Sequence, residues 1–128
     1  MCELVEKRVD EILIENYVGM SFSDRPSCEP TREEIDRAIR DKDFDTRGYQ
    51  KHINELRDEW NRDNSTPQQY NQREQEYHAR HIADFAANGW DNPPVLKNDG
   101  RSVHGGLHRI KAAKHRGNMA ITVWVMCS

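Results

Sequence analysis

The chain has 128 residues and a net charge of −3, a length that favours one domain, residues 1–128, with a modest core. Hydrophobic residues make up 35% and charged residues 32%, and no apolar run approaches the roughly 20 residues that span a bilayer, so we expect no membrane partner. The negative net charge argues against a general nucleic-acid binder.

The three cysteines, Cys2, Cys28 and Cys127, are widely spaced, odd in number and contain no Cys-x-x-Cys pair. This pattern predicts neither a disulfide framework nor a zinc knuckle, and we expect free thiols. The N-terminus is acidic and lacks the charged and then apolar run of a targeting signal. We therefore expect a cytoplasmic protein.

The N-terminal half, residues 1–65, is expected to be helical. Apolar residues at helical spacing predict a helix that ends near Gly19: Leu4, Val5, Val9, Ile12 and Leu13. Ser21 to Pro30 is a turn-rich connection. Thr31 and Glu34 then match a capping box, which predicts a short helix that stops between Asp41 and Asp45.

A second pair of helices follows. Thr46 is a candidate cap for a helix whose core stripe is Tyr49, Ile53, Leu56 and Trp60. Asn64 and Ser65 lead to Thr66 as the cap of a long helix, with Pro67 first and Gln69 completing the box. Its apolar side carries Tyr70, Tyr77, His81, Ile82 and Phe85, and Asn88-Gly89 closes it.

His78 and His81 are three residues apart on that helix and could share a metal ion with another histidine. No acidic residue or cysteine has a matching spacing, so we expect no metal site.

Short strands are expected after Trp90. Pro93-Pro94 blocks a helix and begins an extended run, Val95 to Lys97. Asn98-Asp99-Gly100 predicts a hairpin turn, with Arg101 to Val103 as the return strand. Met119 to Met126 is apolar on both faces, as suits a strand covered by helices. The predicted fold class is α+β, a small mixed sheet packed with helices over residues 66–128, after the helical N-terminal part.

The glycine pair Gly105-Gly106 leads into a predicted helix, Leu107 to Arg116, which Gly117 ends. Two glycines allow unusual backbone angles and let a ligand approach the main chain. The first-turn N–H groups and the positive end of the helix dipole would face that ligand. An anion is therefore the expected guest.

Charge supports this assignment. Residues 101–118 carry five basic side chains and no acidic one, whereas residues 1–100 have a net charge of −8. The basic side chains are Arg101, Arg109, Lys111, Lys114 and Arg116, and three histidines lie among them: His104, His108 and His115. Lys111, Lys114 and Arg116 suit a solvated helix face. Arg109 lies in the first turn, where a cation opposes the dipole, and a bound anion would explain it.

The run from Gly106 to Ala113 resembles the Gly-x-x-Arg-x-x-Ala segment of the ParB/sulfiredoxin fold. Gly89-Trp90 and Pro93 to Lys97 resemble the helix end and strand that precede this segment in the family. Gly117 to Val125 resembles the strand that follows. The resemblance covers about residues 66–125, in the order helix, strand, turn, strand, Gly-x-x-Arg helix, strand.

The resemblance implies a site for CTP or ATP, with Gly105, Gly106, His108 and Arg109 around the phosphates. His104, Lys97 and Arg101 complete the set of candidate ligands. An accompanying Mg²⁺ would need a carboxylate, and Asp91 and Asp99 are the nearest in sequence.

Position 107 is cysteine in sulfiredoxins and glutamate in CTP-hydrolysing partition proteins, but Leu107 offers no nucleophile, acid or base. Sulfinic-acid reduction through it is thereby excluded. A free-serine kinase of the same fold takes its catalytic groups from elsewhere, so phosphotransfer stays open and we name no catalytic residue.

Three hypotheses follow. The first is a nucleotide-binding protein without required turnover. The second is a DNA-binding protein or nuclease of the ParB-like kind, which the acidic remainder disfavours. The third is a small interaction or inhibitor protein, of phage or plasmid type, that acts on a host protein and uses the fold as a scaffold.

Overall fold

The computed structural model describes residues 2–19, 25–63 and 66–127. Its elements are helices and a small mixed sheet, which confirms the α+β class. The chain divides into two compact units. The first combines residues 1–15 with residues 85–128, and the second comprises residues 16–84. The long helix expected to open the C-terminal core thus belongs mostly to the second unit.

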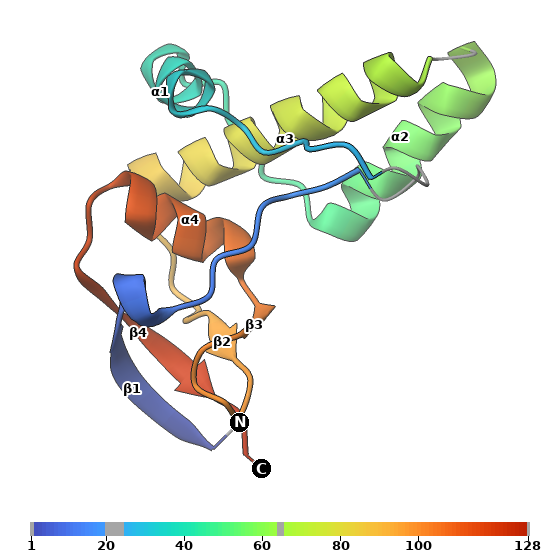
Figure 1. Cartoon of the computed structure of the whole chain (residues 1–128). Helices are drawn as coiled ribbons and strands as arrows, with labels where there is room; N and C mark the ends of the chain where they lie inside the picture. Colours follow the sequence, from blue (N-terminus) through green and yellow to red (C-terminus); the bar gives the residue numbers. More distant parts are fainter. Residues whose placement is uncertain (1, 20–24, 64–65, 128) are drawn as a thin grey trace. The chain divides into compact units, whose positions relative to one another are not determined.

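The first unit is built on a four-stranded sheet of order β1-β4-β2-β3 (Figure 1). Strand β4 (Ala120–Val125) pairs antiparallel with β1 (Glu3–Arg8) and parallel with β2 (Val95–Leu96). Strand β3 (Val103–Gly105) pairs antiparallel with β2, as the predicted hairpin requires. The return strand lies two residues later than the sequence suggested.

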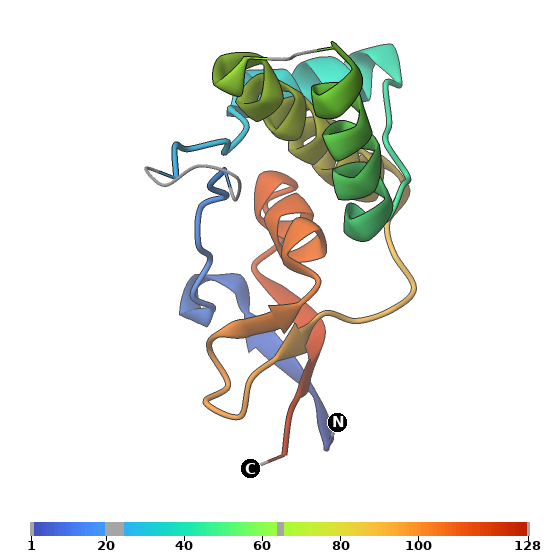
Figure 2. The same ribbon diagram turned by 90° about the vertical axis from the view of Figure 1, so that its right-hand side faces the viewer.

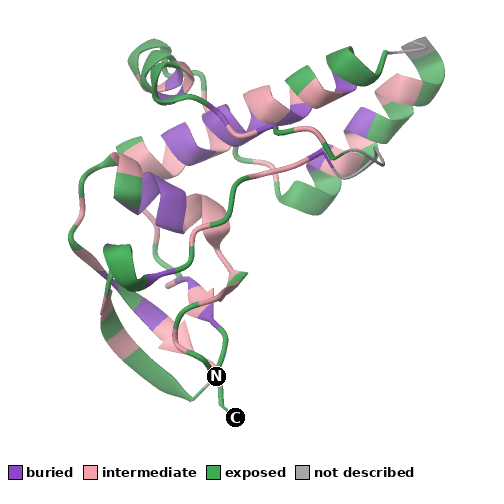
Figure 3. Ribbon diagram, in the orientation of Figure 1, coloured by how far each residue is buried: buried purple, intermediate pink, exposed green. Residues whose placement is uncertain are grey.

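Helix α4 (Leu107–His115) and the 3-10 turn η1 (Val9–Glu11) pack on this sheet, as Figure 2 shows from the side. The buried core is made of apolar side chains from η1 and the residue after it, from β2, from α4 and from β4. These are Val9 and Ile12, Leu96, Ile110 and Ala113, and Ile121 and Val123. Figure 3 marks buried positions on α4 and β4, while β1 is mostly exposed. Burial of these side chains is the main contribution to the unit's stability.

The expected N-terminal helix is wrong, and with it the fully helical N-terminal half. Residues 3–8 form β1, which pairs over its whole length with β4, from Glu3 opposite Val125 to Arg8 opposite Ala120. Leu4 and Leu13, two members of the supposed helical stripe, are exposed. β1 is an edge strand rich in charged residues, a composition that protects sheet edges from further pairing.

The last strand is less covered than expected. Ile121 and Val123 are buried, but Thr122 on the other face is exposed and Ala120 and Trp124 are half-buried. One face of β4 therefore packs on the core and the other lies partly in solvent.

The second unit contains α1 (Arg32–Asp41), α2 (Tyr49–Asp63) and α3 (Pro67–Asn88) up to residue 84. Tyr70, Tyr77 and Ile82 of the predicted apolar side of α3 are buried, as is Leu56 of α2. Aromatic contacts join the two helices: the Trp60 and Tyr70 rings meet edge to face, 5.3 Å apart.

Both predicted capping boxes are confirmed. The Thr31 hydroxyl accepts from the Glu34 N–H, and the Glu34 carboxylate accepts from the Thr31 N–H. Thr66 and Gln69 make the same exchange at 3.2 and 2.9 Å. Thr46, by contrast, is no cap, because α2 begins at Tyr49 and the His52 N–H donates to the Gly48 carbonyl. The expected turn residues Asn64 and Ser65, and part of the loop from residue 21 to 30, lie outside the described residues.

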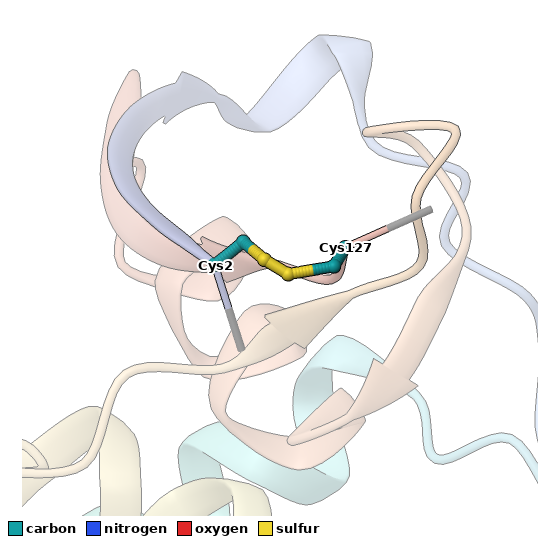
Figure 4. Close-up of a disulfide and its surroundings, with 2 residues drawn as sticks. All are labelled: Cys2 and Cys127. Atoms are coloured by element: carbon teal, nitrogen blue, oxygen red, sulfur yellow. A yellow bond between two sulfur atoms is a disulfide. The ribbon is translucent and has the colours of Figure 1, made fainter.

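Cys2 and Cys127 form a disulfide, with their Cα atoms 5.1 Å apart (Figure 4). The expectation of three free thiols is therefore wrong for this pair, which the pairing of β1 with β4 brings together. Cys28 lies outside this disulfide and is buried. None of the helices described is both long and apolar enough to cross a membrane.

Candidate functional site

The glycine turn lies where β3 ends and α4 begins. Gly105 is the last residue of β3 and pairs with Val95, while Gly106 is the N-cap of α4. Gly106 has φ +88° and ψ 29°, the left-handed region that side-chained residues avoid. Gly105 has no positive φ. Of the two glycines, the conformation thus requires only Gly106.

The first turn of α4 offers backbone donors to a ligand. A glycine N-cap has no side-chain oxygen to accept from the N–H groups of residues 107–109, and the first intrahelical bond runs from the Ile110 N–H to the Gly106 carbonyl at 3.1 Å. No acidic residue lies in this turn. An anion here would therefore meet the positive end of the helix without carboxylate repulsion from that turn.

Arg109 folds back over the glycine turn. A Cβ added at Gly106 would lie 2.8 Å from Nη2 and 3.0 Å from Cζ of Arg109, so the guanidinium lies against the backbone there. Its Nη1 donates to the Asn92 carbonyl oxygen. Arg109 is half-buried and pairs with no carboxylate in the described parts of the chain. Burial lowers the pKa of the guanidinium, which leaves a poorly solvated cation beside the turn.

Asn92 is the residue at this site that the sequence did not reveal. Its contribution is a backbone carbonyl 17 residues before Arg109, so no side-chain motif marks it. The Asn-Pro-Pro sequence, which restricts the backbone of residue 92, is the signal that could have drawn attention to it.

The other candidate ligands are spread along the hairpin. His108 lies in the first turn and is half-buried, and His104 is exposed on β3. Lys97 and Arg101 are exposed at the hairpin tip, where the Lys97 N–H donates to the Ser102 carbonyl at 2.8 Å. Strand β3 separates this tip from Gly106. Lys97 and Arg101 therefore do not lie beside Arg109. A strand advances about 3.3 Å per residue, which leaves Arg101 more than 10 Å from Gly105 along the chain.

Asp99, one of the two carboxylates nearest in sequence, has a structural role at the same tip. Its carboxylate accepts from the Ser102 hydroxyl at 2.6 Å and from the Arg101 and Ser102 N–H groups at 2.8 Å each. These hydrogen bonds, the Ser102 hydroxyl first, hold the pKa of Asp99 at about 2. Asp91 is exposed and precedes Asn92.

The basic face of α4 is only partly solvated. Lys114 and Arg116 are exposed, and the Arg116 guanidinium lies 5.6 Å from the centre of the Trp90 ring. Lys111 is buried, with 6% of its surface exposed, so the solvated-face interpretation fails for this residue. Leu107 is half-buried and adds no polar group to the turn.

No family model, no curated protein and no solved structure matches this chain.

Proposed function

We propose that the turn at Gly105 and Gly106, with Arg109 and the first turn of α4, binds the phosphate groups of a nucleotide, CTP or ATP. The observation that carries the proposal is Arg109, a half-buried guanidinium against Gly106 with no acidic partner among the described residues. A cation held partly out of water is unfavourable without a counter-charge. A phosphate at the start of α4 would supply that charge and accept from the backbone N–H groups.

His108 is the further side chain that we assign to this ligand, since it occupies the same first turn. Its imidazole would donate to a phosphate oxygen, and a nearby phosphate would favour its protonated form. Leu107 brings no acid, base or nucleophile to the turn, so binding without turnover is the function proposed. Any Mg²⁺ would come with the nucleotide, because Asp99 is already engaged by the hairpin.

Isothermal titration calorimetry of the full chain tests this proposal, with CTP, ATP, ADP, GTP and inorganic phosphate, each with and without Mg²⁺. We expect saturable heat with at least one nucleotide. Arg109→Ala should weaken binding roughly tenfold or more, because a charge-assisted hydrogen bond contributes about 1.5–3 kcal/mol. Lys114→Ala is the matched control, since it removes one exposed charge from the other end of α4. No heat with any ligand at millimolar concentration would overturn the proposal.

The other two hypotheses are outcomes of parallel measurements. Binding of DNA that falls steeply with salt, without binding of nucleotides, would favour the DNA-binding or nuclease hypothesis. If the chain binds neither nucleotides nor DNA but captures one host protein, the hypothesis of an interaction or inhibitor protein would be favoured. Neither hypothesis has an observation of its own comparable to Arg109.

The cellular location is linked to the cysteines. A nucleotide ligand suits the cytoplasmic location that we expected, whereas a disulfide such as Cys2–Cys127 is typical of oxidising compartments. Alkylation of cells before lysis, followed by mass spectrometry of the two terminal peptides, separates the alternatives. Alkylated Cys2 and Cys127 would support the cytoplasm, and a linked peptide pair would contradict it.

A further inference from the structure

Three side chains that commonly bind metals meet inside the second unit. Cys28, Glu74 and His78 are all buried, with at most 2% of each exposed, and their candidate ligand atoms all lie within 4.8 Å of one another. The Cys28 Sγ thiol donates to Glu74 Oε2 at 3.6 Å. None of these residues belongs to the glycine turn, so the group is independent of the proposed nucleotide site.

The local structure explains why the three residues converge. Glu74 and His78 are four residues apart on α3 and therefore lie on the same side of the helix, one turn apart. Cys28 comes from the loop that precedes α1, where its N–H donates to the Tyr17 carbonyl at 3.0 Å. The loop is tied to α3 because the Asn71 side chain donates to the Ser27 carbonyl, also at 3.0 Å.

The hydrogen bond between the Cys28 thiol and the Glu74 carboxylate leaves one carboxylate oxygen of Glu74 without a partner among the described residues. Its Oε1 atom is buried and accepts no hydrogen bond from the residues that the structure describes. No lysine or arginine among those residues pairs with it. A fully buried carboxylate with an unsatisfied oxygen and no counter-charge is costly, and such a group needs a cation or a proton.

The imidazole of His78 is held in one orientation beside this carboxylate. It stacks on the Tyr17 ring, with centroids 3.7 Å apart and planes 3° from parallel. The Tyr49 ring lies 6.0 Å from it, at 14°. A ring fixed in this way needs little reorganisation to present a nitrogen to an ion.

We propose that Cys28, Glu74 and His78 bind a divalent transition-metal ion of the zinc class. A thiolate, an imidazole and a carboxylate form a mixed donor set that suits zinc, whereas Mg²⁺ and Ca²⁺ prefer oxygen ligands alone. Around a tetrahedral zinc, ligand lengths of about 2.0–2.3 Å place neighbouring donor atoms roughly 3.5 Å apart, close to the Cys28–Glu74 contact. The ion would replace the Cys28 thiol proton, which passes to solvent, and a fourth position would remain for water.

This inference replaces the expectation of no metal site. The sequence suggests His81 as the partner of His78, but the His81 imidazole instead hydrogen-bonds the Asp45 carbonyl at 2.6 Å. The partners of His78 are Glu74, one turn earlier, and Cys28, 46 residues before Glu74. Only folding brings that cysteine to the helix.

Cobalt substitution tests the site in the full, disulfide-linked chain, where Cys28 is the one remaining thiol. The chain is incubated with Co²⁺, desalted, and analysed for bound metal and for the sulfur-to-cobalt charge-transfer band. We expect one Co²⁺ per chain, a band that Zn²⁺ abolishes, and no competition from Mg²⁺. A folded chain that retains no Co²⁺ or Zn²⁺ would overturn the proposal and show that the cluster is a thiol–carboxyl hydrogen bond only.

Variants assign the ligands. Cys28→Ala should remove the charge-transfer band, and Glu74→Gln should weaken Co²⁺ binding by more than the roughly 10- to 100-fold that follows loss of an outer hydrogen-bond partner. Glu76→Gln is the matched control, since this half-buried carboxylate on α3 accepts instead from Gln72 at 3.3 Å. A band that survives Cys28→Ala would contradict the assignment.

A measurement on the unmutated chain keeps the proposal testable even if these variants do not fold. Zn²⁺ should raise the melting temperature of the disulfide-linked chain, and Mg²⁺ at the same concentration should not. Equal shifts, or none, would contradict the proposal. Nucleotide calorimetry on the same preparation is a separate measurement, so either proposal can fail without the other.

Discussion

The guanidinium of Arg109 lies so close to Gly106 that a Cβ at position 106 would approach its Nη2 to 2.8 Å. Gly106 also has φ +88°, whereas its neighbour Gly105 has no positive φ and open space where a Cβ would go. The two adjacent glycines thus have different roles, although the sequence presents them as a pair.

Gly106→Ala should therefore destabilise the first unit and displace Arg109. We expect the free energy of unfolding to fall by about 1–2 kcal/mol for the left-handed residue, with a further cost from the close contact. Urea denaturation measures this change, and calorimetry should show weaker nucleotide binding. Gly105→Ala is the control and should have a much smaller effect on stability. Equal losses in the two variants would contradict the distinction.

His52 should make stability depend on pH. Burial, and then the nearby Arg47 charge, lower the pKa of this imidazole from 6.5 to about 4. Between these values the unfolded chain binds the proton and the folded chain does not, so the contribution is complete above pH 6.5 and lost as the pH falls toward 4. His52→Phe retains a ring to stack on Tyr77, which lies 3.8 Å away, and should reduce this pH dependence. Unfolding free energies at pH 7, 5.5 and 4.5 measure the effect, and a His52→Phe variant with the same pH dependence as the parent would contradict it.

The Cys2–Cys127 disulfide should stabilise the chain by cross-linking residues 125 positions apart. A link across so long a loop restricts the unfolded state, and removal of a disulfide typically costs about 2–4 kcal/mol. We expect a reducing agent to lower the free energy of unfolding of the parent, measured by urea denaturation, by this amount and to leave the Cys2→Ser, Cys127→Ser double variant unchanged. A parent insensitive to reduction would show that the link contributes little.

Helix caps offer a prediction with an internal control. Thr66→Ala removes the hydroxyl that accepts from the Gln69 N–H, and loss of such a cap costs about 1 kcal/mol. Thr31→Ala should behave alike at α1. Thr46→Ala should have little effect, because α2 begins three residues later. Chemical denaturation of the three variants checks the order, and a loss at Thr46 as large as at Thr66 would contradict it.

Local signals in the sequence predicted much of this fold. The capping boxes at Thr31 and Thr66, the hairpin at Asp99 and the stop at Gly117 each depend on a few neighbouring residues, and each lies where expected. The order of elements from α3 to β4 follows from these boundaries.

Features that depend on distant residues were missed. The segment from Glu3 to Arg8 has no strand pattern of its own and is a strand because β4 offers it an edge. Helical spacing among Leu4, Val5 and Val9 was therefore misleading. The Arg109–Asn92 contact and the group of Cys28 with Glu74 likewise join segments that no local pattern links.

The pairing of β1 with β4 also sets the order in which the chain can fold during synthesis. Residues 3–8 leave the ribosome before residues 120–125 and find their partner only after those residues have been made. Residues 16–84 hold every element of the second unit and can pack while β1 is still single. The sheet can therefore be completed only after the second unit has been made, and residues 3–8 stay unpaired in the interval.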